Sequence, residues 1–195
     1  MKFGTRVTIL TLSLILVTFS IQAQVLERDP LNTFTVSRPV AWTSKERPSP
    51  AIRVMLEVEG NGYVGSCNIS VLSSSSTVNM TQAKVDVSEN KRNLGVTFFQ
   101  SQLSDVAQDV KVQSVVQRRR GVHLGHLINY SYSYVSPALQ RRIHVRAELF
   151  SHSRPGKVFS FTCNTGALSA AVAQRAFSKE SKSFENLSTS LRVDA

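Results

Sequence analysis

The chain has 195 residues, with 23 lysines and arginines against 13 aspartates and glutamates, a formal net charge of +10. This length allows one domain with a substantial core and leaves little room for a second, since a chain of about 150 residues buries roughly 70% of its unfolded surface. The basic excess indicates an anionic neighbour or simple solubility, and it says nothing about the fold.

The first 23 residues have the layout of a secretory signal peptide. Lys2 and Arg6 precede the run Val7–Phe19, which has no charge, proline or glycine, and a polar stretch then ends at Ala23, where cleavage is expected. The run is shorter than the roughly 20 apolar residues of a transmembrane helix, although a permanent N-terminal anchor is the alternative. We therefore predict an exported protein, periplasmic or secreted.

Residues 24–195 are predicted to form a single domain with no transmembrane segment, because no later run approaches the length of a span. Lys2 and Arg6 lie outside this region, so 21 basic and all 13 acidic residues remain, a net charge of +8. The sequence gives no indication of the oligomeric state.

Seven stretches read as strands, each bounded by turn residues. They are Phe34–Arg38, Ile52–Glu59, Tyr63–Ser73, Val110–Gln117, Val122–Val135, Leu139–Phe150 and Lys157–Cys163. Residues 24–33 are predicted to be an irregular lead-in, and Trp42 is expected to anchor the core. Tight turns are indicated at Gly60-Asn61-Gly62 and at Pro155-Gly156.

Three segments are predicted helices. Thr81 is the expected N-cap of the first, and the second places Leu94, Phe98 and Leu103 close to one stripe. The third is one helix or two helices that meet near Phe177. The segments are 81–90, 94–103 and 167–192. Strands, helices, further strands and a closing helix indicate an α+β fold, in which helices cover both faces of an antiparallel sheet.

The two cysteines are expected to form one disulfide, as is usual in an exported chain. Cys67 shares a strand face with Ile69 and Val71, and Cys163 shares one with Phe159 and Phe161. Both thiols therefore lie on the apolar side of a strand. A redox pair is the alternative, but the chain has no Cys-x-x-Cys motif and a buried thiol is unreactive.

Several segments of the chain are similar to the PsbP-like superfamily, which includes the extrinsic photosystem II subunit and a nuclear Ran-GTPase release factor. They are the opening Phe34–Pro39 followed by Trp42, the strand Gly125–Tyr132, the strand Lys157–Cys163 and the closing Phe184–Leu191. The resemblance implies a twisted antiparallel sheet inside an α/β/α sandwich. It also implies a protein that binds protein partners and has no enzymatic activity. The photosystem role is not transferred, since fold does not decide function.

Motifs for catalysis, metals and cofactors are weak or missing. His123 and His126 lie three apart on a strand, which places them on opposite faces and prevents one metal ion from taking both. No Gly-x-Ser-x-Gly elbow and no phosphate-binding glycine loop occurs. We therefore expect no catalytic residue, no metal and no cofactor.

One region carries the whole excess of positive charge. Between Val110 and Ser160 the sequence has nine basic residues and one acidic residue, Glu148. The rest of the region from residue 24 on has twelve basic and twelve acidic residues. Strand alternation places Arg142, His144 and Arg146 on one face. If the tyrosines of the preceding strand lie beside them, guanidinium groups and aromatic rings form a surface for carboxylate, sulfate or phosphate groups.

The candidate site for an anionic partner is therefore Arg118, Arg119, Arg120, Tyr130, Tyr132, Arg142, His144 and Arg146. Charges that only keep the protein soluble or block edge pairing are the alternative. The leading hypothesis is a non-catalytic binding or assembly module of the cell envelope. It contacts an unknown protein or an anionic envelope component, and nucleic acid is not expected because the protein is exported. Two other hypotheses are a hydrolase that uses His144 with a neighbouring Ser or Tyr, and a structural subunit of an envelope complex.

Overall fold

A computed structural model describes residues 23–31, 33–92, 94–105 and 107–193. The predicted signal peptide, apart from Ala23, lies outside these residues. No helix within the described ranges is long and apolar enough to cross a membrane.

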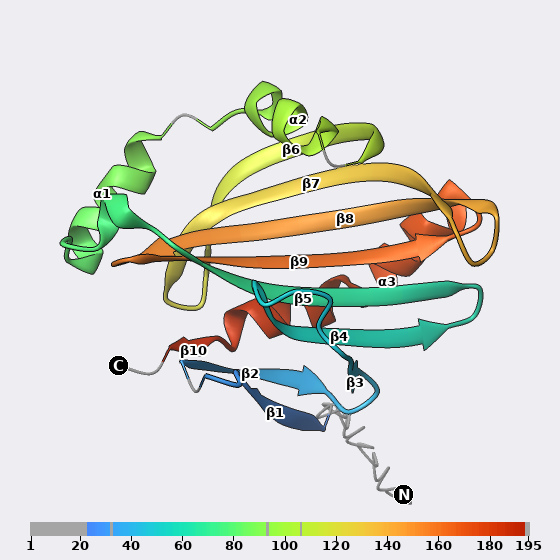
Figure 1. The fold of residues 1–195 in the computed structure, drawn as a ribbon, viewed down its shortest axis with the longest axis horizontal. Helices are drawn as coiled ribbons and strands as arrows, with labels where there is room; N and C mark the ends of the chain where they lie inside the picture. The colour runs from blue at the N-terminus through green and yellow to red at the C-terminus, as the bar shows by residue number, and fades with distance from the viewer. Residues whose placement is uncertain (1–22, 32, 93, 106, 194–195) are drawn as a thin grey trace, which may run out of the picture.

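A large antiparallel sheet of seven strands forms the centre of the molecule (Figure 1). Its strands are ordered β3-β4-β5-β9-β8-β7-β6, so β3 and β6 are the two edges. The bounds are β3 (Thr43–Ser44), β4 (Ile52–Gly60), β5 (Tyr63–Ser73), β6 (Gln108–Arg120), β7 (His123–Ser136), β8 (Arg141–Arg154) and β9 (Lys157–Ala167).

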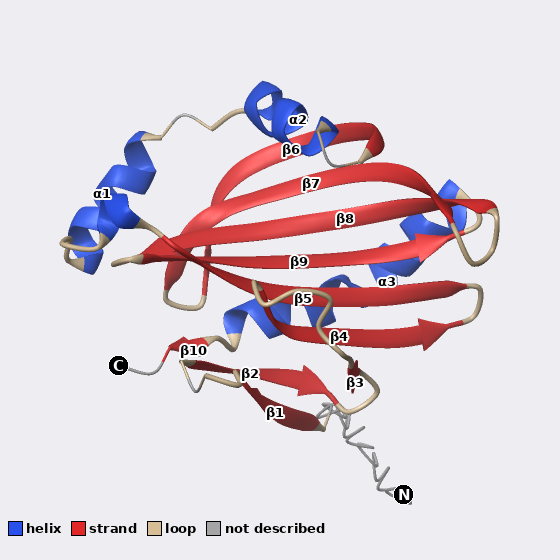
Figure 2. Ribbon diagram, viewed as in Figure 1, coloured by secondary structure: helices blue, strands red, loops and turns tan. Residues whose placement is uncertain are grey.

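A second sheet of three strands has the order β1-β2-β10 and lies beside the C-terminal end of the long helix (Figure 2). Its strands are β1 (Gln24–Arg28), β2 (Phe34–Pro39) and β10 (Arg192–Val193). The helices are η1 (Ser75–Thr77), α1 (Gln82–Lys91), α2 (Val96–Ser104) and α3 (Ala170–Thr189).

Side chains at the element ends explain where the chain changes direction. Thr81 accepts a hydrogen bond from the Lys84 backbone N–H, which confirms it as the N-cap of α1, and Ser169 caps α3 in the same way. Gly62 and Gly156 have positive φ in the two predicted turns.

Helices cover both faces of the large sheet. On one face, α3 and β2 pack onto β5, β9 and β8, with a core that includes Phe34, Phe150, Phe159, Phe161, Phe184 and Trp42. On the other face, Phe99 and Leu103 of α2 pack against β6, β7 and β8, around Val112, Ile128, Tyr130 and Val145. Val85 of α1 is also buried. The predicted α/β/α sandwich is therefore confirmed.

Two details differ from the sequence-based expectation. The lead-in contains β1, an edge strand that pairs only with β2 and buries no side chain fully, so it has no strong apolar pattern. In α2, Leu103 packs inward as predicted, but Phe99 takes the place expected for Phe98, which is exposed, and Leu94 precedes the helix. Of the two alternatives for the closing segment, the structure has one continuous helix, at residues 170–189.

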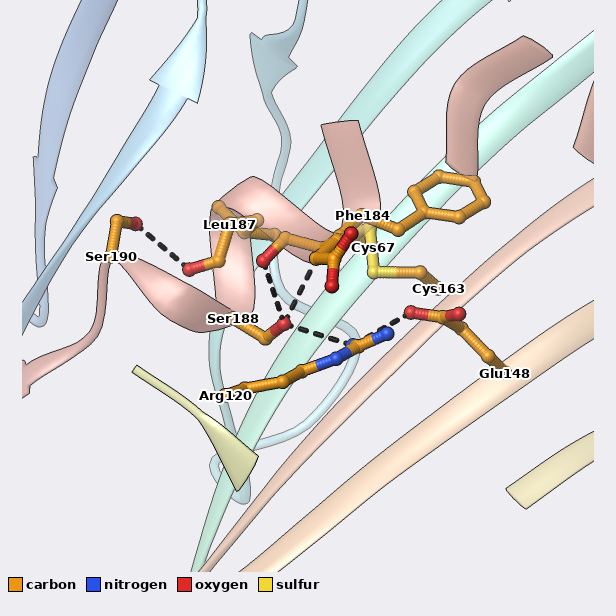
Figure 3. The surroundings of a disulfide bond; sticks show 9 residues. Cys67, Arg120, Glu148, Cys163, Phe184, Leu187, Ser188 and Ser190 are labelled. Atoms are coloured by element: carbon orange, nitrogen blue, oxygen red, sulfur yellow. Dashed lines mark hydrogen bonds and ion pairs between the residues drawn. A yellow bond between two sulfur atoms is a disulfide. The ribbon is translucent and has the colours of Figure 1, made fainter. Parts of the chain in front are cut away.

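The predicted disulfide joins Cys67 of β5 to Cys163 of β9, which are direct partners in the register of these adjacent strands. Both residues belong to the α3 side of the core and are almost fully buried. Figure 3 shows the bond beneath Phe184 and Leu187 of α3. The crosslink therefore connects two strands that are 96 residues apart in the sequence.

Candidate functional site

The register of β7 and β8 separates the predicted tyrosines from the predicted arginines. Tyr130 is paired with Ala147 and Tyr132 with Val145, so both rings point to the α2 side with the apolar residues of β8. Arg142 and Arg146 point to the α3 side, because successive residues of a strand alternate. The expectation that guanidinium groups and tyrosine rings share one surface is therefore wrong.

The predicted arginines also divide between the two ends of the sheet. Arg118 pairs with Gly125 of β7 and Arg142 with Val135, and these two β7 residues lie ten positions apart, which corresponds to about 33 Å along a strand. At the first end Arg118 and Arg119 are exposed, and Arg118 lies 3.4 Å from Glu185 of α3. The basic region is therefore not one continuous surface.

Arg120 is buried and has a structural role. Its Nη1 donates to Glu148 Oε1 and to Ser188 Oγ, each at 2.8 Å, and its guanidinium lies over the Phe150 ring. Figure 3 shows Arg120 between β8 and the C-terminal half of α3. This ion pair ties β6, β8 and α3 together, and it removes Arg120 from any surface that a partner could contact.

The other end of the sheet contains a cavity of about 400 Å³ between the first turns of α3 and strands β6, β7 and β8. Three residues of the predicted site line it, namely Tyr132, His144 and Arg146. Strand alternation turns the Tyr132 ring to the other face of the sheet, so Tyr132 borders the cavity with its backbone. The remaining lining residues are Asp109, Gln113, Ser131, Ser133, Val145, Ala170, Ala173 and Gln174.

Arg146 is the central cation of this cavity. Its Nη1 donates to Gln113 Oε1, and its guanidinium carbon lies 5.3 Å from the centre of the Phe177 ring of α3. The Nε atom is buried and has no hydrogen-bond partner within the described chain. Burial lowers the pKa of Arg146, but a guanidinium group keeps its charge in proteins. The side chain is thus held in place with donor capacity left over.

Asp109, which lines the cavity, compensates the neighbouring cation Arg142. Ser133 Oγ donates to Asp109 Oδ2 at 2.6 Å, and Arg142 Nη1 donates to the same oxygen and to Ser133 Oγ. The hydrogen bond from Ser133 and the charge of Arg142 lower the pKa of Asp109. Because no carboxylate within the described chain forms an ion pair with Arg146, the cavity carries one uncompensated positive charge.

The serines of the cavity are not arranged for hydrolysis. Catalysis by His144 requires a serine or tyrosine hydroxyl within hydrogen-bond reach. Ser133 donates its hydroxyl to Asp109, and Ser131 accepts a hydrogen bond from Gln113. Within the described chain, neither serine is hydrogen-bonded to His144, so no nucleophile and base are paired here.

The other three histidines are buried away from the cavity. His123 Nε2 lies 3.2 Å from the Leu191 carbonyl oxygen on the α3 side, and His126 Nδ1 lies 3.6 Å from Glu89 Oε2 on the α1 side. Their predicted placement on opposite faces is therefore confirmed. Among the described residues, no group of three or more His, Cys, Asp or Glu side chains could hold a metal ion.

The buried His152 predicts a loss of stability in acid. It stacks on Phe159, with ring centres 5.2 Å apart, and burial followed by the charge of His123 lowers its pKa to about 3. Because this value lies below that of the unfolded chain, about 6.5, the unfolded state binds more protons as the pH falls through this range. We expect His152 to cost about 2 kcal/mol of unfolding free energy between pH 7 and pH 5.

Urea unfolding of the wild type and of His152→Phe at both pH values measures this cost. Phenylalanine keeps the stacking on Phe159 but binds no proton, so the variant is expected to lose about 2 kcal/mol less than the wild type. An equal loss in both proteins contradicts the assignment to His152.

Sequence reasoning missed the polar residues that complete the cavity. Asn129, Ser131 and Ser133 form a polar face on a central strand, opposite the face of the tyrosines. A polar face on a strand that is paired on both sides indicates buried hydrogen-bonding groups, and this pattern was readable in the sequence. Asp109 and Gln113 carried no comparable signal, since a β-bulge interrupts the pairing of β6 near them.

No protein-family model and no curated protein matches the sequence. Several solved structures, including those of a cyanobacterial and a yeast protein, are similar in fold. Cyanobacterial PsbP (CyanoP) from Synechocystis sp. PCC 6803 has a TM-score of 0.51 and 12% identity, over 91% of this chain and 96% of that one. The Saccharomyces cerevisiae Ran-binding protein Mog1p has a TM-score of 0.50 and 13% identity, over 88% and 96%. The predicted PsbP-like fold is therefore confirmed, and at these identities the similarity concerns the fold alone.

Proposed function

We propose that the protein is an exported, non-catalytic binding module of the cell envelope, and that it holds an anionic group of its partner at the cavity beside the start of α3. The observation that carries this proposal is Arg146. Its guanidinium is fixed between Gln113 and Phe177, borders a cavity of about 400 Å³ and has no carboxylate partner within the described chain.

Arginine suits this role because its planar donor fork matches carboxylate, sulfate and phosphate groups. A fixed guanidinium also loses less side-chain entropy on binding than a mobile one. Arg142 can contribute once an incoming anion competes with Asp109 for it, and the half-buried His144 lies on the same face.

Export is supported by the disulfide and by the signal-peptide layout of residues 1–23, since disulfides persist in oxidising compartments. A non-catalytic role is supported by the two serines of the cavity, because Ser133 is hydrogen-bonded to Asp109 and Ser131 to Gln113, and within the described chain neither is hydrogen-bonded to His144. Mog1p, which is similar in fold, is described as a binding protein.

The test is binding of a heparin tetrasaccharide, measured by calorimetry at two salt concentrations. Arg146→Gln is expected to weaken binding about tenfold, because hydrogen bonds to charged groups contribute about 1.5–3 kcal/mol. Arg119→Gln removes the same charge from the opposite end of the sheet and is the matched control, with an expected change below about twofold. Equal losses in the two variants reject the cavity as the binding site.

Of the four histidines, His144 alone lines the cavity. His123, His126 and His152 are buried elsewhere and have lowered pKa values, mainly because of burial, so they add no charge to the binding surface.

A further inference from the structure

The hairpin formed by β7 and β8 projects beyond both of its neighbours. β6 is paired with β7 as far as Ser133, and β9 is paired with β8 only from His144 onward. Residues 134–143 therefore continue as a ribbon of two strands at the end of the sandwich where α3 begins (Figure 1). This end also contains the cavity of Arg146.

The tip of this ribbon exposes apolar side chains. Tyr134 is 44% exposed, Val135 53% and Leu139 58%, and Pro137 and Ala138 are also exposed. Single exposed apolar residues are normal on protein surfaces, but several together on one projecting element indicate a contact surface. The tip is basic as well, since Arg141 and Arg142 follow the turn directly.

Hydrogen bonds within the turn pair several of its polar groups. The Gln140 backbone N–H donates to the Ser136 carbonyl oxygen at 2.8 Å, and the Leu139 N–H donates to Ser136 Oγ at 3.3 Å. The Gln140 side chain donates to the Pro137 carbonyl oxygen at 2.6 Å. An element that enters an apolar phase must bring its backbone groups already paired. The turn pairs part of its polar groups in this way, and Leu139 is exposed at its end.

We propose that the β7–β8 tip docks on an anionic lipid surface, with Val135 and Leu139 inserted among the acyl chains and Arg141 and Arg142 at the headgroups. This inference rests on the proposed function in one respect, namely that the partner is anionic, and it names that partner as a membrane leaflet. Apolar residues at the front with arginines directly behind them are the arrangement of interfacial anchors.

The charge distribution favours lipid over a protein groove. Asp109 at the base of the ribbon pairs with Arg142, but no acidic residue lies between Asp109 and Glu148 along the chain, so the positive charge of Arg141 has no acidic neighbour on the ribbon itself. A narrow tip buries too little area for a stable protein interface. A bilayer requires less area, because two or three side chains can insert and every basic residue near the surface adds attraction. The contact is therefore expected to be weak and reversible.

The experiment measures sedimentation of residues 24–195, the protein expected after signal-peptide cleavage, with vesicles of phosphatidylcholine that contain 30% phosphatidylglycerol, against vesicles of phosphatidylcholine alone. Val135→Ser/Leu139→Ser is expected to weaken binding at least tenfold, and Arg141→Gln about fivefold. The matched control is Val122→Ser, which removes a 79% exposed valine from the β6–β7 turn beside Arg118 and Arg119, at the other end of the sheet. It is expected to leave vesicle binding unchanged.

Insertion is detected directly with Leu139→Trp. Brominated lipids are expected to quench its fluorescence, whereas Val122→Trp on the opposite hairpin stays unquenched, and Trp42 is buried in both proteins. Quenching of both or of neither overturns the tip assignment, as does equal loss of binding in the serine variants. Wild type that binds the heparin tetrasaccharide but not the anionic vesicles refutes the lipid inference alone. Wild type that binds neither refutes the proposed function as well.

Discussion

Removal of the disulfide with Cys67→Ala/Cys163→Ala is expected to lower the free energy of unfolding by about 4.5 kcal/mol. The bond closes a loop of 96 residues, and the chain-entropy model assigns a crosslink of this length about that stabilisation. The midpoint of guanidinium unfolding measures the loss, with the slope of the transition showing whether the denatured state has expanded.

A reducing agent supplies the internal control for this prediction. It is expected to lower the unfolding midpoint of the wild type to near that of the double alanine variant, and to leave the variant unchanged. A variant that loses less than about 1 kcal/mol shows instead that pairing of β5 with β9 holds the sheet without the crosslink.

Arg120→Leu is expected to destabilise the protein by about 3–5 kcal/mol, because it leaves Glu148 buried without its charge partner. Arg120 and Glu148 are 5% and 6% exposed, and Ser188, the other acceptor for Arg120, is fully buried. Chemical denaturation at neutral pH measures the effect.

Two further variants separate the ion pair from the general loss of an arginine. Arg119→Leu changes the exposed neighbour on the same strand and is expected to alter stability by less than about 0.5 kcal/mol. Arg120→Leu/Glu148→Leu removes both charges, and it is expected to be more stable than the single Arg120 variant. A double variant that is less stable than the single one contradicts the idea that the unpaired carboxylate causes the loss.

Local patterns were sufficient to predict most of the fold. The bounds of β5 agree with the predicted strand Tyr63–Ser73, and the two glycines of the preceding turn indicated the hairpin with β4. The disulfide followed from alternation in two separate strands, since both cysteines fell on an apolar face. These features depend on residues that are close in sequence, which is why the sequence alone could specify them.

The candidate site was predicted only in part, because it depends on how neighbouring strands align. Alternation correctly placed Arg142, His144 and Arg146 on one face of β8, but it could not show which face of β7 lies beside them. A slip of one residue exchanges the two faces, and the register sets Ser131 and Ser133, not the tyrosines, beside the arginines. Arg120 was grouped with its exposed neighbours because its partners Glu148 and Ser188 are distant in the sequence.

The pairing of β2 with β10 joins two segments that are far apart in the sequence. Phe34 and Thr35 are partners of Val193 and Arg192, and the Ser37 backbone N–H donates to Ser190 Oγ at 2.8 Å. A ribosome or a secretion channel delivers the chain from its N-terminus, so β2 keeps an unpaired edge until about residue 190 has emerged. A chain that stops before residue 190 therefore exposes this edge to proteases and chaperones.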